Sequence, residues 1–580
     1  MRKTTIVLAV LTVGLIFLTI WSWEKLNLTP VSQSILRLSL DDKVESLDPA
    51  KAYSDDSLLI SAQVMEPLYQ YHYLKRPYEI QPLLAEGTPQ ISHKGKLITI
   101  KIRKNVFYHP HEAFDGKPRE LTAEDFITQF KRIALVQMNS PGRGLFMGLI
   151  DGFDQYSELA KNNWENIPTT PLKGVEALDK YTLLIHLNRS EPNIIYYLAL
   201  NFLSPVPWEL VDFHDNNLDS ILIGTGPYVF KGTKDDYLEM EKFRDYREDF
   251  YPTSGDRYAN VQKLLDSSKE RIPFVDHVRF YITRSESKRW DMFFKHELDL
   301  LTVPKTYLPN LYDSTGELNE EIRDRGVVLK HFPTLANRWL AFNMRDPLVG
   351  KNAYLRRAIA YAIDYEKYIQ ILSQNTNLRA NSILVPGISG YLPAKGFRFK
   401  YDPVLAKEYL KLAGFTDPKK MPTIVYSTRG NQGVNLLEAE FIKEHLEAIG
   451  LKVEIEVLVF SEFLKKGRAG ELMFFTDNWL FDFPDGENIL QLLVSTNFPG
   501  VNKSGYSNPK IDELYKALKE TNNLDQRDKI LHSMEEIVFE DLPWIPMMYE
   551  SSFVLQYPEL RNYRKSSIIR NFVKYIKIER

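Results

Sequence analysis

The sequence predicts an α/β fold built as two or more lobes, and three observations support this prediction. The chain has 580 residues, more than one ordinary domain holds. Hydrophobic residues make up 44% of it, enough for substantial cores. Short segments with the period of two that is typical of β-strands alternate with segments that have helical spacing and capping residues. Such alternation is typical of sheets covered by helices.

Charge and composition exclude several classes of function. Lys and Arg (73) nearly balance Asp and Glu (76), leaving a formal net charge of -3, so we expect no nucleic-acid partner. The chain has no cysteine, which excludes disulfides, thiolate metal sites and a lipid-modified N-terminal cysteine. Phe and Tyr are abundant, with 32 of each, and so many rings either fill cores or line a ligand cleft.

The N-terminus predicts export. Arg2 and Lys3 precede an uncharged stretch, residues 4–23, which as a helix is about long enough to cross a hydrocarbon core at roughly 1.5 Å per residue. The stretch exceeds the roughly 7 to 15 apolar residues of a cleaved signal, and no Ala-x-Ala pattern precedes Glu24. We therefore expect residues 1–25 to form a signal anchor or transmembrane helix that keeps the remainder outside the cytoplasm. If this signal is cleaved, the protein is secreted.

The first half of the chain alternates strands with helices. Thr122 is expected to cap a helix whose first turn holds Glu124 and Asp125, carboxylates that the helix dipole favours. The polar residues 245–271 are expected to form a surface excursion. A helix is expected over residues 58–65, and strands are expected at residues 35–40, 97–106, 181–187, 228–231, 237–243 and 275–282.

The second half repeats this alternation. Asn352, Asp364 and Asp402 are expected to start helices, the last of them over residues 404–413 with Gly414 as its stop. Further helices are expected after Asn508 and Asp525. Strands are expected at residues 423–427, 451–459, 471–476 and 543–549.

A carboxylate follows the apolar strand expected at residues 471–476. Trp479, Asp482 and Asp485 lie in the stretch WLFDFPD directly after it. Because an unpaired charge taken out of water costs several kcal/mol, roughly, Asp482 requires a cation, hydrogen bonds or a group that arrives from solution. The third alternative makes Asp482 a ligand-binding residue, and the other interpretation is a satisfied structural aspartate. Trp479 either packs in the core or lines a cleft.

Nine short motifs occur in the order of a known family. The chain resembles the family 5 extracellular solute-binding proteins, the substrate receptors of oligopeptide, dipeptide and nickel ABC importers. The resemblance runs from about residue 47 to residue 549. It rests on LDPA (47–50), EPL (66–68), LTAED (121–125), GTGPY (224–228), LAFN (340–343), LRRAIAYAID (355–364), YDPVLAKEYLKLAGF (401–415), WLFDFPD (479–485) and GYSNP (505–509).

The resemblance implies a two-lobed periplasmic-binding-protein fold of type II, in the large cluster with an extra subdomain in lobe I. The lobes are expected to close on a ligand about strands near residues 224–228, residues 340–343 and Tyr549. No cofactor or metal is implied, and we expect a monomer. The expected division is lobe I at residues 34–75, 205–335 and 550–580, the extra subdomain at 76–204, and lobe II at 336–549.

The resemblance also implies a binding site. In the peptide binders of the family, an aspartate three residues after a tryptophan pairs with the α-ammonium group of the peptide, and Asp482 and Trp479 match those positions. The loop Tyr53, Ser54 and Asp55 matches one that is expected to contact the main chain of an extended peptide, as an added strand does.

Two further expectations concern charged residues of lobe II. A cation for the carboxylate of the ligand is needed as well, and Arg345, Arg379 and Arg429 are the candidates. Asp485 is expected to cap a turn rather than to bind the ligand.

These implications predict the extracytoplasmic substrate-binding component of an ABC importer, without enzymatic activity. It is expected to capture short oligopeptides and deliver them to a permease in the bacterial inner membrane. One alternative is a membrane-tethered peptide or nickel sensor that is not coupled to import. Another is a serine hydrolase of the penicillin-recognising type, because Ser285 and Lys288 match SxxK, although no KTG motif accompanies them. His109 and His111 form only a pair in a loop, which does not indicate a metal site.

Overall fold

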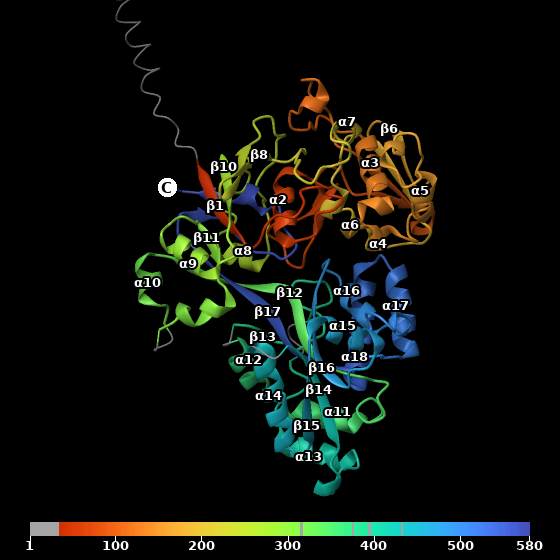
Figure 1. The fold of residues 1–580 in the computed structure, drawn as a ribbon, viewed down its shortest axis with the longest axis vertical. Coiled ribbons are helices and arrows are strands. Elements are labelled where there is room, and N and C mark those ends of the chain that lie inside the picture. Colours follow the sequence, from red (N-terminus) through yellow and green to blue (C-terminus); the bar gives the residue numbers. More distant parts are fainter. Residues whose placement is uncertain (1–33, 314–316, 374–375, 393–395, 431–432, 580) are drawn as a thin grey trace, which may run out of the picture.

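The computed structural model describes residues 34–313, 317–373, 376–392, 396–430 and 433–579, so the anchor expected at residues 1–25 lies outside it. The described chain forms two parts (Figure 1). The first part carries the elements from β1 to α10 and the C-terminal β18 and β19, and the second carries α11 to α18. Within these ranges, no helix combines the length and the apolar character needed to span a bilayer.

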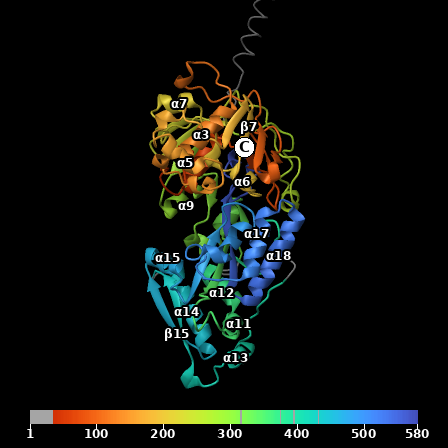
Figure 2. The same cartoon turned by 90° about the vertical axis from the view of Figure 1, so that its right-hand side faces the viewer.

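Two long strands connect the parts. β12 (Val328–Phe342) and β17 (Trp544–Gln556) pair antiparallel along most of their length. Their register shifts between Pro333 and Asn337, close to the middle of β12. A bulge bends and twists a strand, so the connection changes direction between the two parts. Figure 2 shows the two parts joined end to end in the perpendicular view.

The first part contains a four-stranded sheet in the order β1-β10-β9-β8. β1 (Ile35–Leu40) runs parallel to β10 (His277–Ile282), and its Leu side chains alternate inward as the period of two predicts. The other strands are β9 (Tyr237–Lys242) and β8 (Tyr228–Lys234). The hydrophobic cluster at this sheet includes residues of helix α2 (Asp55–Val64).

A second sheet of the first part has the order β4-β5-β7-β6. Helix α3 (Ala123–Ala134) begins at the predicted cap, where Thr122 and Asp125 form a capping box. The fully buried Arg132 of this helix pairs with the fully buried Asp48 at 2.6 Å. The elements of this region are β4 (Gln90–Ser92), β5 (Leu97–Lys101), β6 (Val175–Asp179), β7 (Thr182–His186), α4 (Arg143–Phe146), α5 (Phe153–Leu159), α6 (Ile194–Tyr197) and α7 (Trp208–Phe213).

Shorter elements complete the first part. They are β2 (Tyr69–Tyr71), β3 (Ile80–Pro82), α8 (Arg257–Val261), α9 (Glu286–Phe294), β11 (Leu300–Thr302), α10 (Glu320–Asp324), β18 (Leu560–Arg561) and β19 (Lys577–Ile578). The prediction of a surface excursion at residues 245–271 is wrong in part. Tyr251, Ala259 and Leu264 are buried in one cluster with Tyr73 and Tyr575, so charged neighbours in the sequence concealed a packed segment.

The second part is built on a seven-stranded sheet in the order β11-β17-β12-β16-β14-β15, with β13 paired to β17, and the sheet reaches into the first part, where β11 lies. Asn352, Asp402 and Asn508 cap their helices as predicted, each accepting a hydrogen bond from a backbone N–H of the first turn. The strands are β13 (Leu378–Arg379), β14 (Thr423–Arg429), β15 (Lys452–Leu458) and β16 (Phe474–Leu480). The helices are α11 (Ala353–Ala362), α12 (Tyr365–Ser373), α13 (Pro403–Leu412), α14 (Gly433–Ala448), α15 (Phe460–Ala469), α16 (Glu487–Leu490), α17 (Pro509–Glu520) and α18 (Leu524–Asp541).

Three strands differ most from their predicted bounds. The strand expected at residues 471–476 begins at Phe474 and continues to Leu480, because its pairing with β12 extends to Ala336 opposite Leu480. The strand expected at 97–106 ends at Lys101, and the one expected at 543–549 extends to Gln556. Trp479 therefore belongs to a strand, and Asp482 follows two residues after its end.

Candidate ligand-binding cleft

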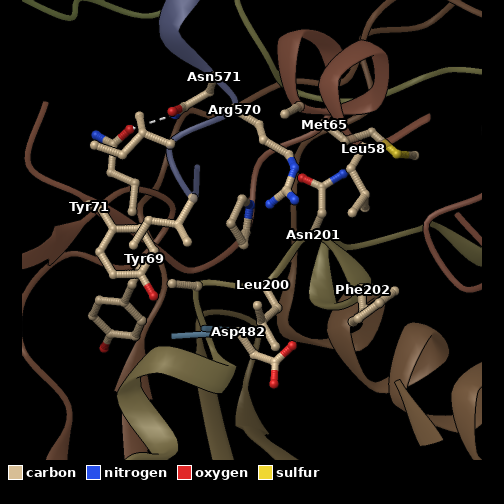
Figure 3. A pocket seen from close by; sticks show the side chains of 16 residues that line it. Leu58, Met65, Tyr69, Tyr71, Leu200, Asn201, Phe202, Asp482, Arg570 and Asn571 are labelled. Carbon is tan, nitrogen blue, oxygen red and sulfur yellow. Dashed lines mark hydrogen bonds between the residues drawn. The ribbon is translucent and has the colours of Figure 1, made fainter. Parts of the chain in front are cut away.

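Two neighbouring pockets lie where the first part meets β16 and the loop after it. Both are lined by Ile569 and Arg570 of the C-terminal segment. Asp482 of the second part lines the first pocket, with Leu58, Met65, Tyr69, Tyr71 and Phe202 among the apolar residues of the first part. Figure 3 shows Asp482 on one side of this pocket and Arg570 and Met65 on the opposite side. The second pocket includes Asn478 and Leu480 of β16 and Asp55 of α2. The two pockets together form a cleft with walls from both parts.

The Asp482 side chain is exposed to solvent. The premise that this carboxylate is taken out of water is therefore wrong for the structure described here, because the strand ends before Asp482 and the loop turns it into the cleft. Among the described residues, Asp482 has no ion-pair partner, and its carboxylate accepts one hydrogen bond, from the Asn488 side-chain amide at 3.1 Å. A hydrated carboxylate with one neutral neighbour is able to take a cationic group of a ligand.

Asn488 connects both predicted binding residues. Its side-chain oxygen accepts hydrogen bonds from the Trp479 indole N–H at 2.7 Å and from the Asp482 backbone N–H at 3.2 Å. The Asn488 side chain is buried in the first turn of α16. It therefore fixes the indole and the loop backbone relative to each other. This role is not visible in the sequence, since an asparagine six residues after an aspartate has no local pattern of its own.

Three residues at the start of α2 are predicted to contact the ligand, Tyr53, Ser54 and Asp55, and only Asp55 lines the cleft. Asp55 lines the second pocket and pairs with Arg570 at 2.7 Å. Ser54 instead caps α2, its hydroxyl accepting a hydrogen bond from the Ser57 backbone N–H. Tyr53 is 72% exposed, and neither Tyr53 nor Ser54 lines the two pockets.

The three arginine candidates have different surroundings. Arg345 stacks over Phe498, and Arg379 pairs with Glu366, and neither lines the two pockets. Arg429, at the end of β14, donates a hydrogen bond of 2.6 Å to the side-chain oxygen of Asn478, which does line the second pocket. Of the three, Arg429 lies nearest to the cleft lining.

Two cations of the first part also line the cleft. Lys565 and Arg570 belong to the C-terminal segment of the first part, whereas the predicted candidates for a ligand cation are all in the second part. Burial lowers the pKa of Lys565 to about 8, although Asp41 and Asp55 oppose this shift. Lys565 donates a hydrogen bond to the Thr302 hydroxyl at 2.8 Å. A ligand carboxylate beside a pocket-lining lysine with such a pKa favours the charged form of the lysine.

A buried hydroxyl completes the first pocket. Tyr71 lines this pocket and is 6% exposed. Among the described residues, its hydroxyl has no hydrogen-bond partner. Since buried polar groups are nearly always hydrogen-bonded, this hydroxyl is available to a polar group of a ligand.

The motifs that suggested other chemistry have structural roles. The Ser285 hydroxyl accepts a hydrogen bond from the Lys288 backbone N–H and caps α9. His109 is buried, with Nε2 bonded to the Gly226 carbonyl, and burial lowers its pKa to about 4. Asp485 accepts a hydrogen bond from the Glu487 backbone N–H, as expected of a turn cap, and also pairs with Arg527 at 2.8 Å. In the described ranges, no group of three or more His, Cys, Asp or Glu residues is placed to hold a metal ion.

Residues 79–500 match the family described as Bacterial extracellular solute-binding proteins, family 5 Middle, and the chain belongs to this family. The chain is 26% identical over 519 residues to Heme-binding protein A of Haemophilus influenzae, covering 87% of this chain and 85% of that protein. It is 24% identical over 520 residues to the Dipeptide-binding protein of Escherichia coli K12, covering 86% of each.

Solved structures share this fold. The unliganded open form of the periplasmic murein tripeptide-binding protein MppA has a TM-score of 0.75 at 21% identity, with 94% of this chain and 98% of that chain covered. HbpA2 from Haemophilus parasuis has a TM-score of 0.77 at 20% identity, with 94% and 100% covered. The predicted α/β periplasmic-binding-protein fold and the predicted family are therefore confirmed.

Proposed function

We propose that this protein is the peptide-binding component of an ABC importer, in which the α-ammonium group of a short peptide pairs with Asp482. The observation that carries the proposal is the Asp482 carboxylate, which lines an interlobe pocket and lacks an ion-pair partner among the described residues. Relatives named as dipeptide-binding and di/tripeptide-binding proteins support a peptide ligand. Residues 1–25 hold the protein at the outer face of the inner membrane, where it delivers the peptide to a permease.

The ligand lies with its first residue in the pocket that contains Asp482. Leu58, Met65 and Phe202 provide apolar contacts for the first side chain, and the Tyr71 hydroxyl bonds a polar atom of the ligand. Trp479 forms part of the adjacent wall, since Asn488 holds its indole next to the Asp482 loop. Main-chain contacts come from the loop Tyr53, Ser54 and Asp55 when the lobes close.

The carboxylate of the peptide binds at the second pocket. Arg429, which reaches the pocket-lining Asn478 at 2.6 Å, is the cation of the second part, and Lys565 and Arg570 line the pocket from the first part. Arg570 already pairs with Asp55, so a ligand carboxylate competes with that aspartate. Asp482 lines the first pocket and Lys565 lines the second, so each charge of a short zwitterionic ligand has an oppositely charged side chain in the cleft.

Calorimetry with short peptides and their N-acetylated forms tests the ammonium pairing. Acetylation removes the positive charge, so we expect at least about tenfold weaker binding. Asp482→Asn is expected to weaken binding of the free peptide to a similar extent and to leave the N-acetylated peptide unaffected. Asp266→Asn, at an exposed aspartate outside both pockets, is the matched control. Equal affinity for the two peptide forms in the wild type would contradict the proposal.

A further inference from the structure

The residue next to Asp482 is packed into the first part of the molecule. Phe483 is 6% exposed and stacks on Tyr196, with ring centroids 5.8 Å apart and planes 15° apart. Tyr197 meets the same ring edge-on at 5.7 Å. The other members of this hydrophobic cluster lie between Ala50 and Ile223, in the first part. A side chain of the ligand-binding loop thus belongs to the core of the opposite part.

The buried Glu191 and Glu487 and the half-buried Lys519 join the two parts at the other end of this loop. Lys519 of α17 contacts Glu191 at 2.8 Å and Glu487 at 2.7 Å. The Asn193 side-chain amide donates a hydrogen bond of 2.5 Å to Glu487. Glu191 and Asn193 precede α6 in the first part, whereas Glu487 and Lys519 belong to the second. Figure 1 places α16 and α17 at the end of the second part that faces α6, and Figure 2 places α17 there as well.

Both contacts lie in the loop that carries the candidate binding carboxylate. Phe483 follows Asp482 directly, and Glu487 precedes Asn488, the residue that holds Asp482 and Trp479. Hence both ends of the loop from Asp482 to Asn488 are attached to the first part. Any separation of the parts at this point pulls on the loop that carries the carboxylate.

The chemistry of the contact suits reversible docking. A buried ion pair often stabilises a contact no more than an apolar pair of the same shape. Charged side chains therefore add little to the stability of a permanent contact. When the parts separate, Glu191, Glu487 and Lys519 regain water, and Phe483 leaves the cluster that contains Tyr197. Interfaces between mobile domains are typically more polar than permanent ones.

We propose that the region around α6 docks on the ligand-binding loop and acts as its positioning element. Phe483, Glu487 and Lys519 are positioning residues: they fix the place of the Asp482 carboxylate and the angle between the two parts before any ligand binds. The effect on ligand selection rests on the proposed function, whereas the effect on the angle between the parts does not.

Distance measurements on the ligand-free full chain test the docking. Because the chain has no cysteine, Glu158→Cys on α5 and Lys411→Cys on α13 allow specific attachment of two spin labels at exposed positions. Lys519→Met and Phe483→Ala are each expected to broaden the distance distribution and shift it to different values. Lys516→Met, an exposed lysine of the same helix, is expected to leave it unchanged.

Glu191→Gln provides an independent test from the opposite part. It is expected to reproduce the effect of Lys519→Met, and the double variant is expected to add little, because both changes remove one contact. A thermal melt of each variant confirms that it is folded. Unchanged distances in Lys519→Met, Glu191→Gln and Phe483→Ala would overturn the proposal.

Binding measurements test the positioning role. In Phe483→Ala, we expect the ratio of affinities for a free peptide and its N-acetylated form to fall about tenfold, and Phe483→Leu to restore part of it. An unchanged ratio in a variant with altered distances would overturn the positioning role. If the wild type shows no preference for the free peptide, the proposed function fails, while the distance result still decides whether the docking occurs.

Discussion

The Trp479 indole N–H donates a hydrogen bond of 2.7 Å to the side-chain oxygen of Asn488. The same oxygen receives the Asp482 backbone N–H, and the Asn488 amide donates to the Asp482 carboxylate. One buried side chain therefore determines the relative positions of the Trp479 indole and of the Asp482 carboxylate, which lines the cleft. The family's spacing of three residues between tryptophan and aspartate has a physical basis here, because both groups are within reach of one amide.

Replacing Asn488 by leucine is expected to weaken peptide binding and to destabilise the fold. Leucine leaves the Trp479 indole and the Asp482 N–H without a partner, which costs about 2 kcal/mol of unfolding free energy. Urea unfolding and calorimetry measure the two effects. Asn488→Asp retains the acceptor for Trp479 but places a second carboxylate beside Asp482. It should therefore preserve the fluorescence of folded Trp479 and alter peptide affinity, and identical behaviour of the two variants would contradict the assigned contacts.

Features encoded by neighbouring residues were predictable from the sequence. Four helix caps occur where they are predicted, at Thr122, Asn352, Asp402 and Asn508. A cap depends on a side chain and an N–H two or three residues away, so its signal is local. The position of Asp482 after a strand was predicted for the same reason, with the family resemblance adding its role.

Features made by distant residues were not predictable. Arg570 meets Asp55 across 515 positions, and Lys519 meets Glu191 across 328. No local pattern marks such a pair, because each partner looks like an ordinary surface charge in the sequence. The exposure of Asp482 was not predictable either. The apolar run in the sequence does not show where the pairing between β16 and β12 ends, and therefore where the chain turns toward solvent.

The two aspartates of the stretch are expected to differ in stability measurements. Asp485 is buried and pairs with the buried Arg527 at 2.8 Å, so Asp485→Asn weakens the partner of a buried cation and should cost about 3 kcal/mol. Asp482→Asn removes an exposed carboxylate, so this variant should unfold at nearly the same urea concentration as the wild type. Comparable losses in both variants would show that Asp482 has a structural role.

The pair of Arg132 and Asp48 is expected to be important for the stability of the first part. Both side chains are fully buried, and Arg132 also bonds Asn216 at 2.8 Å. Arg132→Met leaves Asp48 as an uncompensated buried charge, with an expected cost of about 3 to 5 kcal/mol. The double variant Arg132→Met with Asp48→Leu should recover part of this loss in urea unfolding. No recovery would indicate that the contact with Asn216, rather than the ion pair, dominates.

The contact between the parts is expected to weaken as the pH rises. Burial, with repulsion from Glu191 and Asp485, raises the pKa of Glu487 from 4.5 to about 7, although Lys519 opposes this shift. Tyr515 of α17 and Arg527 of α18 also face this group. When the parts separate, Glu487 regains water and its pKa returns toward 4.5, so the docked state binds a proton more tightly than the separated state.

Protonation of Glu487 therefore favours docking. Its contribution to the stability of the docked state is complete below about pH 4.5 and is lost as the pH rises to about 7. Spin-label distances at pH 5 and pH 8 should differ in the wild type, with the broader distribution at pH 8. Glu487→Gln mimics the protonated side chain and keeps an acceptor for Lys519, so its distribution should stay narrow at both values. Since Lys519 has a raised pKa, it remains charged throughout this range. If the distance distribution of Glu487→Gln broadens with pH as that of the wild type does, a group other than Glu487 is responsible for the pH dependence.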